Sequence, residues 1–337
     1  MIKRLGDSTI EFLRMPSIVG FASAVGKKEA QGPLKDDFDK ISYDMRMGQD
    51  TWEKAESQLQ KEVLSIALSK AEKNACDIDF LFAGDLLNQC ISSSYGLKDF
   101  SIPYLGQYGA CSTMVQGLIM ASVMVGSGAS HLSACVTSSH FCSAERQYRF
   151  PLDYGGQRPQ SSQWTVTGAG CCILSDGVGD SSPKVKIATV GRIVDLGVTD
   201  QNNMGAAMAP AATDTLLRFF RDTSTLPSDY DMIYTGDLGK IGSELLYELL
   251  SKEGFDIKDR HKDCGVMIFD TEDMDVHSGG SGCGCCSSVL CGHILRNVVK
   301  GNLKNILVMA TGALLSPTSI QQSETIPSIA HLVNIVL

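Results

Sequence analysis

Apolar residues recur along this chain at helical spacing in some segments and as short unbroken runs in others. Trp52 and Leu59 belong to a series spaced three and four residues apart, which predicts an amphipathic helix over 51–73. Asp50 is placed to cap this helix, and Glu53, three residues later, completes the pattern of a capping box. The first long element is therefore expected to be a helix with one buried face.

Short apolar runs bounded by Gly, Ser and Asp predict buried strands, and the longer segments between them predict helices. The expected strands are 78–83, 132–137, 171–174, 231–235 and 305–310. The expected later helices are 112–125, 210–220, 243–252 and a last one that ends at Gly301. Pro210 suits the first turn of its helix, and Gly254 suits the end of the next. Such alternation of strands and helices is typical of α/β proteins with mixed or mainly parallel sheets covered by helices.

The second half of the chain repeats the order of the first. Gly-Asp-Leu stands at 84–86 and again at 236–238, each time directly after an apolar strand. The spacing of later features is longer in the second half, which an inserted loop over 255–278 explains. These observations predict an internal duplication of a βαβ unit.

The helices that begin after Cys111 and Cys283 are rich in small residues and have no polar face. A helix that is apolar all round is buried on all sides, so we expect the two to form a central layer between two sheets. The predicted fold class is α/β, with duplicated halves over 1–183 and 184–337 in a five-layer αβαβα sandwich.

Composition narrows the function classes. The chain has 337 residues and a formal net charge of −9, and no Lys/Arg cluster resembles a nucleic-acid footprint. An acidic surface also argues against simple electrostatic docking on anionic lipid. No signal-peptide core is recognised, and no apolar stretch is expected to reach the roughly 18 residues of a membrane helix. The 12 cysteines are then expected to be reduced and mostly buried.

Cys111, in Gly109-Ala110-Cys111-Ser112-Thr113, is the first candidate for chemistry. A thiol at a helix N-terminus is favoured as thiolate, which is how many catalytic cysteines are activated. A condensing enzyme also needs an imidazole or amide from the second half, to take a proton and polarise a carbonyl. Asp237 stands at one expected position, where its charge would oppose thiolate formation.

The other expected position, near Ser281 to Cys283, contains neither His nor Asn. His261, His277 and His293 stand elsewhere in the second half, and the sequence leaves open whether one of them reaches the site. The cysteines after Cys283 lack the paired Cys-x-x-Cys knuckles of a structural zinc site, so no metal and no cofactor are predicted.

The expected architecture, with a cysteine at the start of a buried helix, resembles the thiolase-like fold. The sequence also resembles one family, stage V sporulation protein AD of endospore-forming bacteria, over nearly its whole length. The motifs that carry the resemblance are Gly84-Asp85-Leu86-Leu87-Asn88-Gln89, the Cys111 motif, Thr137-Ser138-Ser139-His140, Ala144-Glu145-Arg146-Gln147-Tyr148-Arg149-Phe150-Pro151, Asp153-Tyr154-Gly155-Gly156-Gln157, Met208-Ala209-Pro210-Ala211-Ala212, Ala313-Leu314-Leu315-Ser316-Pro317 and Thr325-Ile326-Pro327-Ser328-Ile329-Ala330-His331.

This resemblance implies a role in moving dipicolinate (pyridine-2,6-dicarboxylate) into the developing spore. It implies direct binding of that ligand at Asp85, Cys111 and His140. It also implies partners among the membrane-embedded proteins of the same sporulation channel assembly, and a peripheral location on the cytoplasmic side of the forespore inner membrane. The thiolase-like fold adds a homodimer by analogy.

Physical chemistry adds further candidates for such a ligand. A planar dicarboxylate favours bidentate guanidinium partners, and Arg146 and Arg149 follow the strand that ends at His140. Asp85 could hold a calcium ion that accompanies the ligand, orient His140, or cap the next helix. The predicted function is non-enzymatic dipicolinate binding. The alternatives are an acyltransferase that uses Cys111 and a structural scaffold for a membrane complex.

Overall fold

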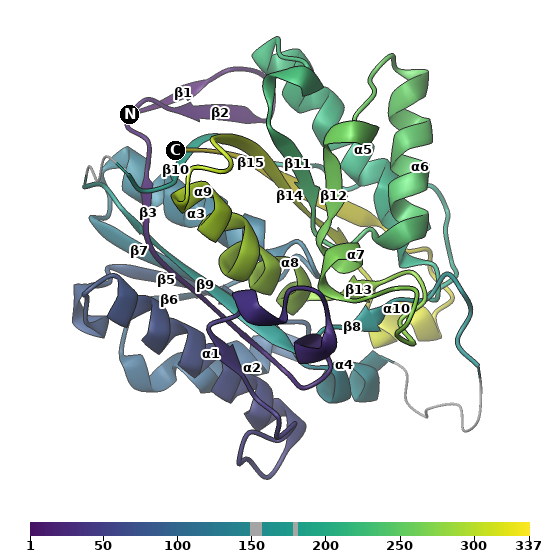
Figure 1. Ribbon diagram of the computed structural model, residues 1–337, viewed down its shortest axis with the longest axis horizontal. Coiled ribbons are helices and arrows are strands. Elements are labelled where there is room, and N and C mark those ends of the chain that lie inside the picture. Colours follow the sequence, from purple (N-terminus) through teal and green to yellow (C-terminus); the bar gives the residue numbers. More distant parts are fainter. Residues whose placement is uncertain (149–156, 178–180) are drawn as a thin grey trace.

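The computed structural model describes residues 1–148, 157–177 and 181–337. Its main strands form one 13-stranded sheet with two similar halves, here called the first-half and second-half sheets, which are joined by the pairing of Lys184 with Ser17 (Figure 1). The first-half sheet has the order β6-β5-β7-β9-β3. Its strands are β3 (Ser17–Val25), β5 (Phe80–Gly84), β6 (Tyr104–Gly106), β7 (Leu132–Ser139) and β9 (Gly168–Ser175). The second-half sheet has the order β12-β11-β14-β15-β10. Its strands are β10 (Lys184–Thr189), β11 (Met232–Thr235), β12 (His261–Asp263), β14 (Asn305–Ala313) and β15 (Ser328–Val336).

The two sheets have the same connectivity and the same strand directions. In the first, β5 runs parallel to β6 and β7, whereas β9 is antiparallel to β7 and β3. In the second, β11 runs parallel to β12 and β14, whereas β15 is antiparallel to β14 and β10. The predicted duplication is confirmed. The expected division between 183 and 184 lies in the connection from β9 to β10.

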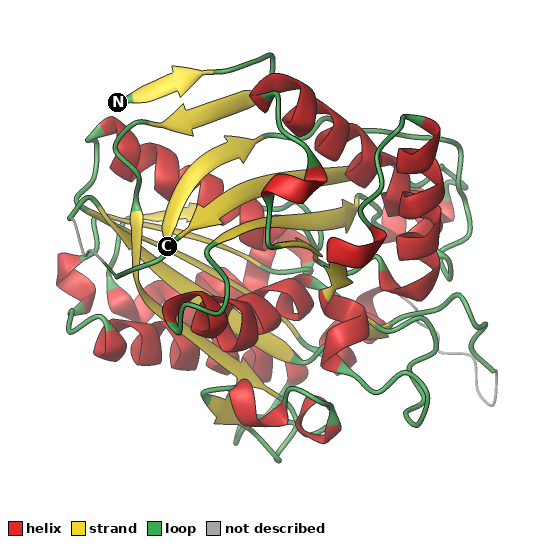
Figure 2. Cartoon of the chain, turned by 45° about the horizontal axis from the view of Figure 1, so that its top comes forward, coloured by secondary structure: helices red, strands yellow, loops and turns green. Residues whose placement is uncertain are grey.

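Helices form the other layers (Figure 2). α1 (Trp52–Lys70) and α2 (Ile91–Leu97) cover the first sheet, and α5 (Met204–Thr223) and α6 (Gly239–Lys252) cover the second. Between the sheets lie α3 (Thr113–Ser127) and α8 (Cys283–Val289), and α8 continues through a π-helical turn, Leu290–Ile294, into α9 (Leu295–Val299). This is the expected five-layer arrangement.

The remaining elements are short. The strands are β1 (Ile2–Arg4), β2 (Thr9–Phe12), β4 (Lys40–Ile41), β8 (Trp164–Thr165) and β13 (Gly280–Ser281). The helices are α4 (Phe141–Tyr148), α7 (Cys264–Ile268) and α10 (Pro317–Gln321). Single 3₁₀ turns span Glu29–Gln31, Lys35–Asp37, Ala75–Asp77, Asn88–Cys90, Lys98–Phe100, Pro227–Asp229 and Lys258–Arg260.

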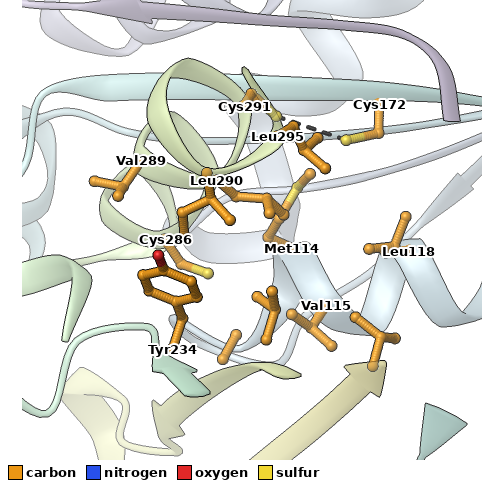
Figure 3. Close-up of a cluster of buried hydrophobic side chains, with 14 of the residues drawn as sticks. Met114, Val115, Leu118, Cys172, Tyr234, Cys286, Val289, Leu290, Cys291 and Leu295 are labelled. Carbon is orange, nitrogen blue, oxygen red and sulfur yellow. Dashed lines mark hydrogen bonds between the residues drawn. The ribbon is translucent and has the colours of Figure 1, made fainter. Parts of the chain in front are cut away.

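The central helices pack through small and sulfur-containing side chains. Met114 and Leu118 of α3 lie in one cluster with Leu290 and Cys291, and the thiols of Cys291 and Cys172 are 3.6 Å apart (Figure 3). The segment Ala110–Ser127 is long and apolar enough to cross a membrane by length and composition, contrary to the sequence expectation, and 72% of it is buried inside the protein. It contains the core helix α3.

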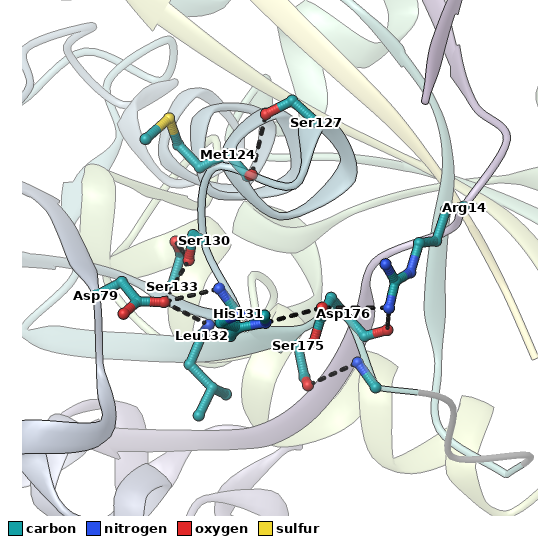
Figure 4. A network of polar contacts seen from close by, with 11 residues as sticks. Arg14, Asp79, Met124, Ser127, Ser130, His131, Leu132, Ser133, Ser175 and Asp176 are labelled. Atoms are coloured by element: carbon teal, nitrogen blue, oxygen red, sulfur yellow. Dashed lines mark hydrogen bonds and ion pairs between the residues drawn. The ribbon is translucent and has the colours of Figure 1, made fainter.

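A polar network fixes the turn between α3 and β7 (Figure 4). Asp79 Oδ2 accepts hydrogen bonds from the backbone N–H groups of His131 and Leu132. His131 contacts Asp176, which also pairs with Arg14. These bonds join the starts of β5 and β7 to the end of β9 and fix the positions of the three strands relative to one another. The candidate functional site lies near the opposite ends of these strands.

Three further sequence predictions are corrected by the structure. Thr51, not Asp50, caps α1, because its side chain accepts the backbone N–H of Lys54. Helix α5 begins at Met204, capped by Asn203, so Pro210 lies inside the helix rather than at its first position. The segment 255–278, expected to be an inserted loop, contains the edge strand β12 and the helix α7.

Candidate functional site

A cavity of about 700 Å³, counting its mouth, lies where the two halves meet. The segments that line it follow strands or precede helices of both halves, as ligand sites do in open α/β sheets. Most of the wall is apolar or aromatic. The lining residues are Leu86, Tyr108, Ala110, Cys111, Ala144, Glu145, Tyr148, Gln163, Thr165, Gln201, Met204, Met208, Ser281, Gly282, Ala313 and Leu315.

Cys111 is positioned on this wall by a sharp backbone turn that packs closely against the second half. Ala110 has a positive φ of 49°, which is rare for a residue with a side chain and turns the chain sharply before α3. The second half presses against this turn, because a Cβ atom at Gly312 would lie only 2.3 Å from the carbonyl oxygen of Gly109. Cys111 itself is 9% exposed.

The polar partners of Cys111 come from the second half. Its sulfur lies 3.8 Å from Ser281 Oγ, which donates a hydrogen bond of 2.8 Å to Asp237 Oδ2. Asp237 also accepts the backbone N–H of Gly282 and, at 2.8 Å, the hydroxyl of Thr311. The positions expected to carry the catalytic partners of a condensing enzyme are therefore beside the cysteine, and they hold an aspartate and a serine.

The electrostatics of this group keep the thiol protonated. Burial raises the pKa of Cys111 well above its usual range, and the charge of Asp237 raises it further. Burial also raises the pKa of Asp237, while its hydrogen bonds to Cys111, Ser281 and Thr311 act in the opposite direction. The activation expected from the helix N-terminus is outweighed, so Cys111 is a neutral thiol at neutral pH.

Asp85 and His140 do not line the cavity. Asp85 is fully buried and accepts hydrogen bonds from the backbone of Leu87 and from Ser93, as a residue that caps a turn does. His140 Nδ1 accepts the backbone N–H of Cys142, so Nε2 carries the proton and donates it to Met45 O at 2.8 Å. Direct ligand contacts by these two side chains stay a prediction.

Neither of the two predicted arginines is seen on the cavity wall. Arg146 pairs with Glu53 on the outside of the protein and does not line the cavity. Arg149 lies outside the described residues, directly after Tyr148, which does line it. Of the predicted site residues that the structure describes, Cys111 is the one on the cavity wall.

The second-half histidines that the sequence left open lie elsewhere. His261 bonds to Thr235 and Tyr247, and His277 and His293 pair with aspartates outside the cavity. Over residues 1–148, 157–177 and 181–337, no group of three or more His, Cys, Asp or Glu side chains is arranged to hold a metal ion.

Sequence reasoning missed Tyr108 and Gln163 as parts of the site. Tyr108 follows the edge strand β6 closely, a position that a strand-end search would find. Gln163 precedes β8, a two-residue strand that pairs with β13 and brings Thr165 beside Ser281. Such a short strand has no periodicity, so its sequence contained no signal for this contact.

Two halves of this topology around a buried cysteine define a thiolase-like protein, and solved structures agree. 3-Oxoacyl-acyl-carrier-protein synthase III of Aquifex aeolicus is similar with a TM-score of 0.58 and 12% identity, over 96% of this chain and 100% of that one. Cerulenin-bound OleA of Xanthomonas campestris is similar with a TM-score of 0.61 and 12% identity, over 96% and 97%. At such identities the likeness concerns the fold.

Sequence comparison identifies the family within that class. The model of the stage V sporulation protein AD family matches residues 6–336. The protein of that name from Bacillus subtilis (strain 168) is 44% identical over 330 residues, which cover 98% of this chain and 97% of the relative. The chain belongs to the stage V sporulation protein AD family, and its role lies in sporulation.

Proposed function

We propose that this protein binds dipicolinate in the cavity beside Cys111, without chemical conversion, for uptake into the developing spore. The absence of chemical conversion is proposed from the Cys111–Ser281–Asp237 group. At the positions where a condensing enzyme is expected to carry its imidazole base or amide, this chain has a carboxylate and a hydroxyl. A neutral thiol beside a buried aspartate is a poor nucleophile.

The shape and chemistry of the cavity support a small aromatic ligand. Most of its lining residues are apolar or aromatic and a few are polar, which is the usual composition of small-molecule pockets. Tyr108 and Tyr148 form one wall, and aromatic rings stack well on a planar heterocycle. A guanidinium partner for the carboxylates at Arg149 stays a sequence-based prediction, because that residue lies outside the described part of the chain.

Calorimetric titration with dipicolinate tests this proposal. Saturable heat is expected for the wild-type protein, and weaker binding is expected for C111A, which changes the cavity wall. C76A is the matched control, because Cys76 is an exposed thiol and its loss leaves the cavity unchanged. Absence of binding at millimolar dipicolinate would refute the proposal.

The enzymatic alternative rests on the position of Cys111 on the cavity wall. Incubation with acyl-CoA followed by mass spectrometry tests it. We expect no acyl group on Cys111, since no imidazole within the described residues lines the cavity and the Gln163 amide N–H groups are already bonded to backbone carbonyls. A stable acyl adduct on that residue would instead support an acyltransferase.

For the assembly, we propose peripheral attachment to the membrane-embedded proteins of the sporulation channel, on the cytoplasmic side of the forespore inner membrane. The scaffold alternative shares this attachment but needs no ligand, so the calorimetric test separates the two. Salt or alkaline washing of isolated spore membranes should release the protein, whereas retention through such washes would contradict peripheral attachment.

A homodimer is the further proposal for the assembly. The edge strand β6 exposes Leu105 (48%) and Tyr104, and an exposed apolar edge strand can pair with its own copy about a two-fold axis. Sedimentation should show a dimer that L105E weakens and that a charge placed at exposed Tyr43 leaves intact. A wild-type monomer at micromolar concentration would refute this.

A further inference from the structure

Gln163 is held in one orientation at the wall of the cavity. Its side-chain Nε2 donates to two backbone carbonyls of the second half, those of Asp237 at 2.7 Å and Gly280 at 2.9 Å. Only an amide NH₂ group can satisfy two carbonyl oxygens, so these bonds determine which end of the amide is oxygen. Gln163 is 4% exposed, and the amide therefore has little freedom to turn.

The other end of this amide has no partner. Gln163 Oε1 is buried and accepts no hydrogen bond from the described residues. A buried acceptor without a donor destabilises the folded protein, and a donor on a ligand would remove that cost. Because Gln163 lines the cavity, a bound molecule is the natural source of that donor.

The neighbouring hydroxyl groups are already used as donors within the protein. The Tyr148 hydroxyl donates its hydrogen bond to Leu86 O. In the hydrogen bond of 3.0 Å between the two tyrosines, Tyr108 is therefore the donor and Tyr148 the acceptor. Ser281 donates to Asp237, and Thr165 is within 3.4 Å of Glu145. These parts of the wall offer oxygen acceptors to a ligand.

We propose that Gln163 Oε1 accepts a hydrogen bond from the bound ligand, so that the cavity selects an aromatic acid that carries a donor, either a protonated carboxyl or a carboxamide. The inference rests on the proposed function, because it names the form of dipicolinate that the same cavity takes. Among the described residues, the titratable groups around this position are Glu145, Cys111 and the two tyrosines on the cavity wall, with Asp237 and Cys283 next to Cys111.

The test compares two ligands on three proteins by calorimetry at pH 8. The ligands are pyridine-2,6-dicarboxylate and its monoamide, 6-carbamoylpyridine-2-carboxylate, which keeps the ring and supplies N–H donors. The proteins are the wild type, Q163L and the control Q160L, since Gln160 is exposed. We expect the wild type and Q160L to prefer the monoamide, and Q163L to lose about tenfold of that preference. An unchanged preference in Q163L would overturn the inference.

A second measurement needs only the wild-type protein, in case Q163L does not fold. Dicarboxylate affinity should rise from pH 8 to pH 6, with net proton uptake in buffers of different ionisation enthalpy, and the affinity of the monoamide should change less. Equal pH dependence for both ligands, or no proton uptake, would overturn the inference while leaving dipicolinate binding intact. If neither ligand binds at any pH, the proposed function itself fails.

Discussion

At the residue scale, one aspartate changes the chemistry of the site. Asp237 is buried, receives three hydrogen bonds from Ser281, Gly282 and Thr311, and stands beside the Cys111 thiol. A buried carboxylate near a thiol disfavours the second negative charge that a thiolate would bring. The fold thus retains a cysteine at its central helix while its neighbours suppress the nucleophile.

Removing that charge should make the cysteine more reactive. For D237N we expect faster alkylation of Cys111 by iodoacetamide at pH 8, because each unit by which the pKa falls increases the thiolate fraction about tenfold. Mass spectrometry of the Cys111 peptide measures the rate. The exposed Asp259 provides the control variant D259N, which should react like the wild type. An equal or slower rate in D237N would contradict the electrostatic account.

Buried carboxyl groups predict how stability depends on pH. Burial, followed by the charge of Asp85, raises the pKa of Glu56 to about 8, and burial raises that of Glu29 to about 7. At pH values above the pKa that these groups have in the unfolded chain, the folded state binds more protons than the unfolded state. Stability therefore falls as the pH rises toward the pKa values of the folded state. Burial lowers the pKa of His261 and His331 to about 4, which has the opposite effect below about pH 6.5.

Between pH 6.5 and 8 the effect of the carboxyl groups on stability is therefore separate from that of the two histidines. There the free energy of unfolding should decrease with pH, by up to about 1.4 kcal/mol per unit for each such carboxyl group. Urea denaturation at several pH values measures this. E56Q should flatten the dependence, and E72Q, at an exposed position, should not. A free energy that rises over this window would show that Glu56 is ionised in the folded protein.

At the element scale, close backbone approach shapes the central layer. Helix α8 begins with Cys283-Gly284-Cys285-Cys286, and small residues let it lie directly on β9 and β7. A Cβ atom at Gly170 of β9 would lie 2.3 Å from the carbonyl oxygen of Ser287. The glycines and cysteines of this region are thus explained by packing between a helix and a strand.

The substitution G170A tests this packing. Because backbone atoms cannot move aside as a flexible side chain can, we expect the free energy of unfolding to fall by about 1–3 kcal/mol. G106A on the edge strand β6 is the matched control, since its new methyl group would meet only the Tyr104 side chain, with the hydroxyl oxygen at 3.2 Å. Denaturant unfolding measures both. Equal stability of G170A and the wild type would mean that α8 can shift away from the sheet.

At the scale of the whole molecule, the two halves share one interior. Helix α3 of the first half contacts β14 and β15 of the second, and α8 of the second half contacts β7 and β9 of the first. Each half therefore covers the inner face of the other's sheet. The cavity depends on both, because Cys111 comes from one half and Ser281 from the other.

This shared interior predicts a single cooperative unfolding transition. Far-UV circular dichroism and calorimetry of the full chain should give coincident midpoints. The fragments 1–183 and 184–337, expressed separately, should not show cooperative unfolding, because each would expose the inner face of its sheet to water. A fragment that unfolds cooperatively by itself would contradict this account.

The sequence predicted the elements better than their ends. The spacing of apolar residues was enough for α1, yet the choice of Thr51 over Asp50 as its cap depends on the backbone angle at which the chain enters the helix. Pro210 was expected to begin α5, but packing against β14 and β15 supports an earlier turn that starts after Asn203. Tertiary contacts here outweigh the local preference of proline.

By itself, the sequence predicted five of the ten main strands, the longest helices, the repetition in two halves and a cysteine at the start of a buried helix, because local periodicity and small residues encode these directly. The strands β3, β6, β10, β12 and β15 were not predicted. Only the tertiary structure decided which polar groups share the cavity. It brought Gln163, Ser281 and Asp237 to one wall and left Asp85 and His140 bonded to local backbone. Those partners lie far apart along the chain, on connections whose course depends on how the two halves pack together.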